Sequence, residues 1–137
     1  MSRQESDAKQ YIQPEGVAAP RQPYTHVIRV GKTVYVSGQV PIDESGKVVA
    51  PGDPSLQAQQ CWKNISLCLA SAGASLEDVV KVVCFFSDIR HVKYELDVRR
   101  RLFRRDRYPV VSLVEAAKVG SSEDNILMEI EVTAVIP

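Results

Sequence analysis

The 137-residue sequence contains only two histidines and three cysteines, and it has no long apolar segment. His26 and His91 lie far apart, and no cluster of His, Cys and Asp has the spacing of metal ligands, so we expect no metal site. No apolar run approaches the roughly 18 residues needed to cross a bilayer, so no membrane-spanning helix is expected. Residues 1–16 are polar and lack the apolar stretch of a secretory signal.

An excess of charge of one sign is also absent. Lys and Arg total 17, Asp and Glu total 17, and the formal net charge is zero. Proteins that bind nucleic acids or membrane surfaces through general electrostatics carry a basic excess. The composition therefore argues against both kinds of partner.

The three cysteines, Cys61, Cys68 and Cys84, are odd in number and lie among apolar residues. This pattern is typical of reduced, buried thiols in a cytoplasmic protein. A nucleophilic cysteine needs a polar, electropositive environment, which none of the three local sequences offers. We therefore expect structural thiols and a cytoplasmic location.

Length and patterning predict one α+β domain. Residues 1–16 are expected to form a flexible arm, which leaves residues 17–137 as a single domain. Two helices are expected, one from an N-cap at Asp53 to Gly73 and one over residues 90–105, with Val92, Leu96, Leu102 and Phe103 facing inward. Strands are expected at residues 26–30, 33–40, 79–86, 110–116 and 126–136. This order favours a mixed β-sheet with both helices on one face.

Two expected strands carry polar residues in alternation. In residues 126–136, Glu129 and Glu131 share one face, and unpartnered carboxylates are not tolerated in a dry core. That face therefore lines a cleft or a subunit interface, or it is an ordinary solvated surface. In residues 33–40, the same alternation places Gly38 on the apolar face and Gln39 on the polar face.

Four segments together resemble one family. They are VYVSGQVP (34–41), ASAGASLEDVVKVVCFFSDI (70–89), PVVSLVEAAKV (109–119) and LMEIEVTAV (127–135), and they resemble the RidA family, also called YjgF/YER057c/UK114. The resemblance implies a chorismate-mutase-like fold and a homotrimer with a small-molecule cleft between subunits. It also implies hydrolytic deamination of reactive enamines or imines, without a cofactor.

The resemblance also assigns residue roles. It implies that Glu129 holds or activates a water molecule as the catalytic residue, and that the cleft wall includes Tyr24, Ser37, Gly38 and Ser112. The family motif Pro-x-Arg-Ser corresponds here to Pro109-Val110-Val111-Ser112, so Val111 replaces the arginine that clamps the substrate carboxylate. A bidentate Arg–carboxylate pair contributes on the order of 2–3 kcal/mol, which valine does not supply. The usual family activity is therefore expected to be weakened.

Arg21 is the candidate substitute for the missing arginine. It lies in AAPRQPYTH (18–26), which is similar to the N-terminal loop of the aminomuconate deaminases within the family. Arg21 either contacts the anionic end of a ligand or is a surface charge. The sequence leaves both interpretations open.

Two functions of other classes remain open. Without the arginine, the protein could be a non-catalytic trimer that binds a small ligand. Six arginines between positions 99 and 107 could instead contact RNA phosphates, with Arg100, Arg104 and Arg107 on one helical face. A solvated helix surface is the favoured interpretation of that run, because the net charge is zero and no aromatic residues are interleaved for base stacking. Nucleic acid is therefore not the expected partner.

Overall fold

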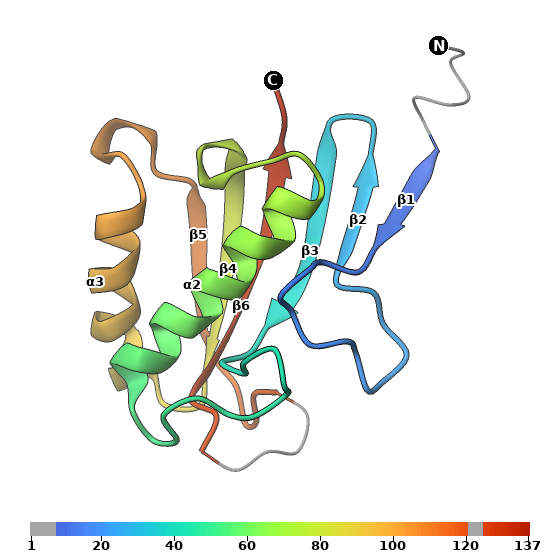
Figure 1. Ribbon diagram of the computed structural model, residues 1–137. Helices are drawn as coiled ribbons and strands as arrows, with labels where there is room; N and C mark the ends of the chain where they lie inside the picture. The colour runs from blue at the N-terminus through green and yellow to red at the C-terminus, as the bar shows by residue number, and fades with distance from the viewer. Residues whose placement is uncertain (1–7, 121–124) are drawn as a thin grey trace.

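The N-terminal part of the domain is built on a β-hairpin. In the computed structural model, which describes residues 8–120 and 125–137, strands β2 (Val27–Val30) and β3 (Thr33–Gln39) pair antiparallel (Figure 1). Gly31 in the turn has a φ of 58°, a left-handed conformation that glycine adopts without a Cβ clash. The strands expected at residues 26–30 and 33–40 are confirmed.

Six strands form one mixed sheet in the order β1-β2-β3-β6-β4-β5. The strands not yet introduced are β1 (Lys9–Ile12), β4 (Val79–Phe86), β5 (Val110–Glu115) and β6 (Met128–Val135). β4 and β5 run parallel, whereas the other neighbouring pairs run antiparallel. β6 therefore lies between the hairpin and the β4–β5 pair and joins the two halves of the sheet.

Both helices, α2 (Pro54–Ser71) and α3 (Val92–Leu102), cover the same face of the sheet, as predicted (Figure 1). The Asp53 side chain caps α2 by accepting a hydrogen bond from the Leu56 N–H at 3.0 Å. The apolar stripe of α2 is buried at the expected 3.6-residue spacing, with Ala58, Cys61, Ile65, Cys68 and Leu69 in the core. In the described residues, neither helix combines the length and hydropathy of a membrane-spanning segment.

The second helix is shorter than predicted. Phe103 has extended backbone angles that end α3 after Leu102, and short 3-10 turns flank it at Ile89–His91 and Arg105–Arg107. Arg104 and Arg107 therefore do not share a helical face with Arg100, contrary to expectation. Leu102 is 40% exposed rather than inward-facing.

The inward face of α3 carries an ion pair that the sequence pattern did not reveal. The buried Glu95 carboxylate accepts hydrogen bonds from Arg99 Nη2 at 2.5 Å and from Arg99 Nε at 3.0 Å. Trp62 of α2 donates its indole N–H to the same carboxylate at 3.0 Å. The Trp62–Glu95 hydrogen bond joins the two helices, and each buried charge of the ion pair is satisfied by its partner. Trp62 is itself buried, with 1% of it exposed, and belongs to the packing between the two helices.

Part of the predicted flexible arm is a strand. Residues 9–12 form β1 and pair with β2, with Ile12 opposite Val27 at the edge of the core. The pairing satisfies backbone groups of β2 that an open edge would leave exposed. The arm prediction over residues 1–16 is therefore wrong for residues 9–12, and residues 1–7 lie outside the described residues.

A β-bulge in β3 corrects the predicted alternation. Three residue steps from Val36 to Gln39 on β3 face two steps from Val132 to Ile130 on β6. The additional residue reverses the alternation beyond it. Gln39 is consequently only 2% exposed on the helix side, and Gly38 lies on the open face of the sheet.

The alternation of β6 is confirmed. Met128, Ile130, Val132 and Ala134 are buried beneath the helices, while Glu129 and Glu131 lie on the open face. That open face is also rich in exposed apolar side chains, namely Tyr35, Val110, Val114 and Val135. No element of the described chain covers it, and this decides where the candidate site is accessible.

Candidate active site

A cavity of about 440 Å³ lies where the β3 bulge, β6 and the loop before β2 meet. Its size is typical of small-molecule sites. Its polar lining is supplied by Arg21, Gln22, Tyr24, Ser37 and Glu129. Five residues predicted from the resemblance therefore line one cavity, namely Arg21, Tyr24, Ser37, Gly38 and Glu129.

Glu129 is the acidic group of this cavity. Its side chain packs directly on Gly38, where a Cβ would lie 2.6 Å from Oε2. Burial raises the pKa of the Glu129 carboxyl, the Gly120 N–H works against the shift by hydrogen bonding, and the charge of Glu131 adds to it. The group is therefore a better proton acceptor than a solvated glutamate.

Tyr24 supplies a phenol close to the carboxylate. Its pKa is raised by burial first and then by the negative charge of Glu129, so the hydroxyl stays protonated and can donate a hydrogen bond. The ring contacts His26 edge-on, with centroids 5.4 Å apart.

Ser37 is hydrogen-bonded to the two residues that precede β2. Its Oγ donates to the Thr25 carbonyl at 2.6 Å, and its backbone N–H donates to the His26 carbonyl at 2.9 Å. The hydroxyl proton is therefore already used within the chain. Toward a ligand, Ser37 can act as an acceptor or as part of the wall.

Arg21 is the cationic group of the cavity lining. Its guanidinium lies over Gly46, where a Cβ would approach Nη2 to 2.5 Å. Among the described residues, no carboxylate lies within 4.0 Å of it. The guanidinium is thus available to an anionic ligand as far as these residues are concerned.

Val111 and Ser112 do not line this cavity. β4 lies between β5 and β6, so neither residue neighbours Glu129 within one chain. Val111 pairs with Val82 and packs on the helix side, and Ser112 pairs with Val83 on the open side. A single chain therefore brings together five of the seven predicted site residues and leaves Val111 and Ser112 apart from them.

The described residues provide neither a metal-binding cluster nor a reactive thiol for this cavity. No group of three His, Cys, Asp or Glu side chains lies together in this part of the chain. All three cysteines are buried and unpaired, as predicted. Burial raises the pKa of each thiol, to about 12 for Cys68, which opposes thiolate formation.

Sequence reasoning missed two groups of residues around this cavity. Gln22, Gly46 and Gly120 line it without any motif to mark them. His26 and Gln39 form a buried hydrogen bond behind it, which only the reversed alternation of the bulge brings about.

Comparison with known proteins identifies the family of this chain. The family model described as Endoribonuclease L-PSP matches residues 16–136. A RutC family protein of Pyrococcus abyssi is 35% identical over 128 residues, which cover 93% of this chain and 97% of the relative. A 2-iminobutanoate/2-iminopropanoate deaminase of Dermatophagoides farinae is 32% identical over 117 residues, which cover 85% and 88%.

The solved structures agree with the sequence relatives. RidA from the Antarctic bacterium Psychrobacter sp. superposes with a TM-score of 0.84 at 30% identity, covering 93% of this chain and 99% of that one. The predicted RidA-like fold, a mixed sheet with two helices on one face, is confirmed. The chain therefore belongs to the endoribonuclease L-PSP family, the group that includes the RutC and RidA proteins.

Proposed function

We propose that this protein hydrolyses small reactive imines or enamines to carbonyl compounds and ammonia. The observation that carries the proposal is a single cavity in which Glu129, with a raised pKa, faces a phenol and a guanidinium. A general base, a hydrogen-bond donor and an anion contact are the groups that imine hydrolysis requires.

The reaction follows from these positions. Glu129 accepts a hydrogen bond from a water molecule and takes up its proton as the water oxygen attacks the C=N carbon. Glu129 passes this proton to the nitrogen, which gives a tetrahedral carbinolamine. It then transfers the proton of the new hydroxyl group to the nitrogen as the C–N bond breaks, so that ammonia and a carbonyl compound leave and the carboxylate is restored. Tyr24 and Ser37 hold the substrate, and Arg21 contacts its carboxylate.

The relatives indicate which substrates to test first. One relative is named as a deaminase of 2-iminobutanoate and 2-iminopropanoate. Because Val111 stands at the motif position of the clamping arginine, we expect slower turnover of 2-imino acids here than in arginine-bearing relatives. The proposal includes a cytoplasmic location, which the unpaired, buried thiols support.

The proposal extends to a homotrimer with the cavity at the subunit interface. The open sheet face exposes Tyr35 by 53% and Val110 by 67%, an apolar surface that a second copy would cover. If the contact includes the edge strand β5, Val111 and Ser112 would approach the cavity of another subunit. Light scattering should report about three times the 15.2 kDa chain mass. A value near 15.2 kDa at micromolar concentration would contradict this part of the proposal.

The catalytic test is ammonia release from 2-iminobutanoate generated in place by an amino-acid oxidase. The wild type should accelerate release above the rate in buffer, and Glu129→Gln should lose that acceleration. If the wild type does not release ammonia faster than buffer alone, the deaminase proposal is wrong. Binding of 2-oxobutyrate in that case would identify a non-catalytic ligand-binding protein.

RNA binding through the arginine-rich segment has less support. Arg99 is buried against Glu95, and Arg100 and Arg104 pair with Asp97 and Asp106 at 3.3 Å. Binding to phosphates should weaken steeply with added salt, so a salt titration with a single-stranded RNA tests this alternative.

A further inference from the structure

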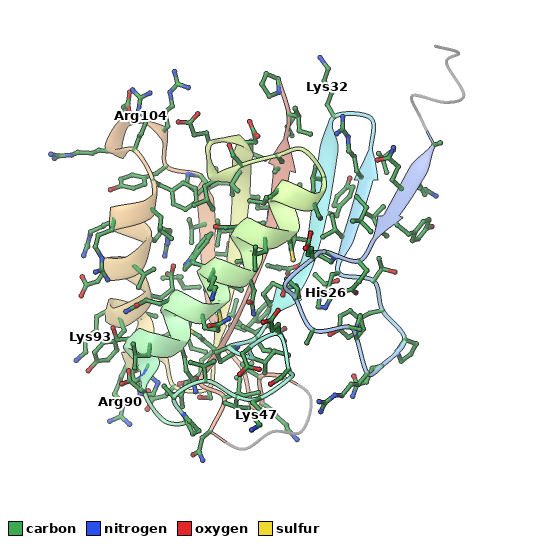
Figure 2. All side chains as sticks on the ribbon, in the orientation of Figure 1. His26, Lys32, Lys47, Arg90, Lys93 and Arg104 are labelled. Carbon is green, nitrogen blue, oxygen red and sulfur yellow. The ribbon has the colours of Figure 1, made fainter. Side chains whose placement is uncertain are left out.

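His26 is a buried histidine that lies behind the cavity rather than in it. Only 4% of it is exposed, and it precedes β2 beside the loop that begins at Ala18 (Figure 2). Its Nε2 lies 2.7 Å from the Ala18 carbonyl oxygen, which can only accept, so Nε2 carries the proton. In the neutral ring, Nδ1 then accepts from Gln39 Nε2 at 3.0 Å.

The hydrogen bonds continue into the bulge of β3. The Gln39 amide also donates to the Ser37 carbonyl at 3.1 Å, and the Ser37 N–H donates to the His26 carbonyl at 2.9 Å. Gly38, between Ser37 and Gln39, is the residue on which Glu129 packs. One side of the imidazole is thus linked to the wall that supports the acidic group.

The other side of the imidazole is linked to the opposite wall. Ala18 itself lines the cavity, and the loop that follows carries Arg21 and Tyr24. The Tyr24 ring contacts the His26 ring edge-on at 5.4 Å. The loop therefore has two contacts with a ring that is fixed in the core.

We propose that His26 is a positioning residue of this cavity. It holds the loop that carries Arg21 and Tyr24 in a fixed position relative to the bulge that supports Glu129. Histidine suits this task because a rigid neutral ring offers one donor and one acceptor on separate edges. The kinetic test of this role rests on the proposed function, whereas the test by trypsin cleavage does not.

Two amide variants separate the two hydrogen bonds. In His26→Asn, the amide lies near the position of Nδ1, so it can accept from Gln39 but cannot reach Ala18. In His26→Gln, the longer side chain reaches the position of Nε2 and can donate to the Ala18 carbonyl. Only the Asn variant should release the loop.

The rate of trypsin cleavage after Arg21 measures how readily the loop is released. The rate of cleavage after Lys32, in the hairpin turn, measures opening of the sheet. His26→Asn should be cut after Arg21 about tenfold faster than wild type, with cleavage after Lys32 unchanged, while His26→Gln should resemble wild type. Equal acceleration at both sites, or none after Arg21, would overturn the proposal. If His26→Asn does not fold, His26→Phe keeps a ring against Tyr24, removes both hydrogen bonds and carries the same expectation.

The kinetic readout distinguishes positioning from mere stability. With 2-iminobutanoate, His26→Asn should raise KM about tenfold and change kcat less than about threefold, because the loop binds substrate while Glu129 lies on β6. An unchanged KM with a released loop would overturn the positioning role. If the wild type shows no deaminase activity, the proposed function fails, and the trypsin comparison still decides the role of His26.

Discussion

Gly38 lies directly against the carboxylate of Glu129. A Cβ built on Gly38 would lie 2.6 Å from Glu129 Oε2 and 2.7 Å from Cδ, closer than carbon and oxygen atoms approach without displacement. The glycine is required by this close approach, and the bulge in β3 brings the two residues together. Any side chain at position 38 must move the group proposed to activate water.

Gly38→Ala should therefore impair catalysis without unfolding the protein. The added methyl group meets the flexible end of one side chain, so Glu129 rotates away while the sheet remains intact. We expect a loss of up to about 100-fold in kcat/KM for 2-iminobutanoate. The melting temperature should change by less than about 4 °C.

A double variant is the control for this interpretation. If Gly38→Ala acts through Glu129, combining it with Glu129→Gln should be no slower than Glu129→Gln alone. Additive losses would show that Gly38 contributes in another way, such as direct contact with substrate.

The raised pKa of Glu129 predicts a pH dependence of activity. Because the ionised carboxylate accepts the proton of water, activity should fall as the pH drops through a value above the ordinary range of glutamate. The residual rate of Glu129→Gln should lack this step. A wild-type rate that stays constant through this range would contradict the role of Glu129 as base.

The same pKa shift predicts the sign of a stability effect. Between the lower pKa of the unfolded chain and the raised pKa of the folded one, the folded protein binds more protons, so stability falls as the pH rises. Ionised Glu129 thus opposes folding at neutral pH. The melting temperature of Glu129→Gln relative to wild type should be higher at about pH 7 than at about pH 4.

Substitutions of Arg21 and Val111 are expected to change the affinity for a carboxylate ligand in opposite directions. Arg21→Ala should weaken binding of 2-oxobutyrate about tenfold, measured by titration calorimetry, because it removes a guanidinium from the cavity lining. Val111→Arg should strengthen binding by roughly 2 kcal/mol, about 30-fold, and only in an assembled oligomer. Val111 lies outside the cavity of its own chain, which is why assembly is needed.

Arg21→Lys is the matched control, since it keeps the charge but loses the bidentate geometry. It should bind 2-oxobutyrate with an affinity between those of wild type and Arg21→Ala. If neither Arg21→Ala nor Val111→Arg changes the affinity, the cavity is not a carboxylate site, and 2-imino acids are the wrong substrate class.

The buried pair of Glu95 and Arg99 should matter for stability alone. Glu95→Ala leaves the Arg99 guanidinium and the Trp62 indole N–H without their buried acceptor. We expect a loss of about 3–5 kcal/mol in urea unfolding, followed by the fluorescence of the single tryptophan. Arg100→Ala on the exposed side of α3 is the control and should cost less than about 1 kcal/mol. A similar loss of unfolding free energy in both variants would contradict the claim that the buried pair stabilises the protein more than the exposed one.

Local patterns were sufficient to predict most elements of this fold. The turn glycine at position 31, the N-cap at Asp53 and the alternation in β6 depend on neighbouring residues, so they can be read along the chain. Helix α3 was overestimated because an arginine-rich segment favours helix locally, whereas Phe103 takes an extended conformation in which it packs on Trp62 at 5.3 Å between ring centroids.

Only the tertiary structure decided how the site is assembled. The sequence by itself determined the family resemblance and the residue types, including Val111 at the arginine position. The strand order placed β4 between Val111 and Glu129, and the bulge turned Gln39 into the core and Gly38 toward Glu129. The bulge depends on pairing between segments about 90 residues apart, and the position of β4 depends on pairing between segments about 30 to 55 residues apart, which no local periodicity encodes.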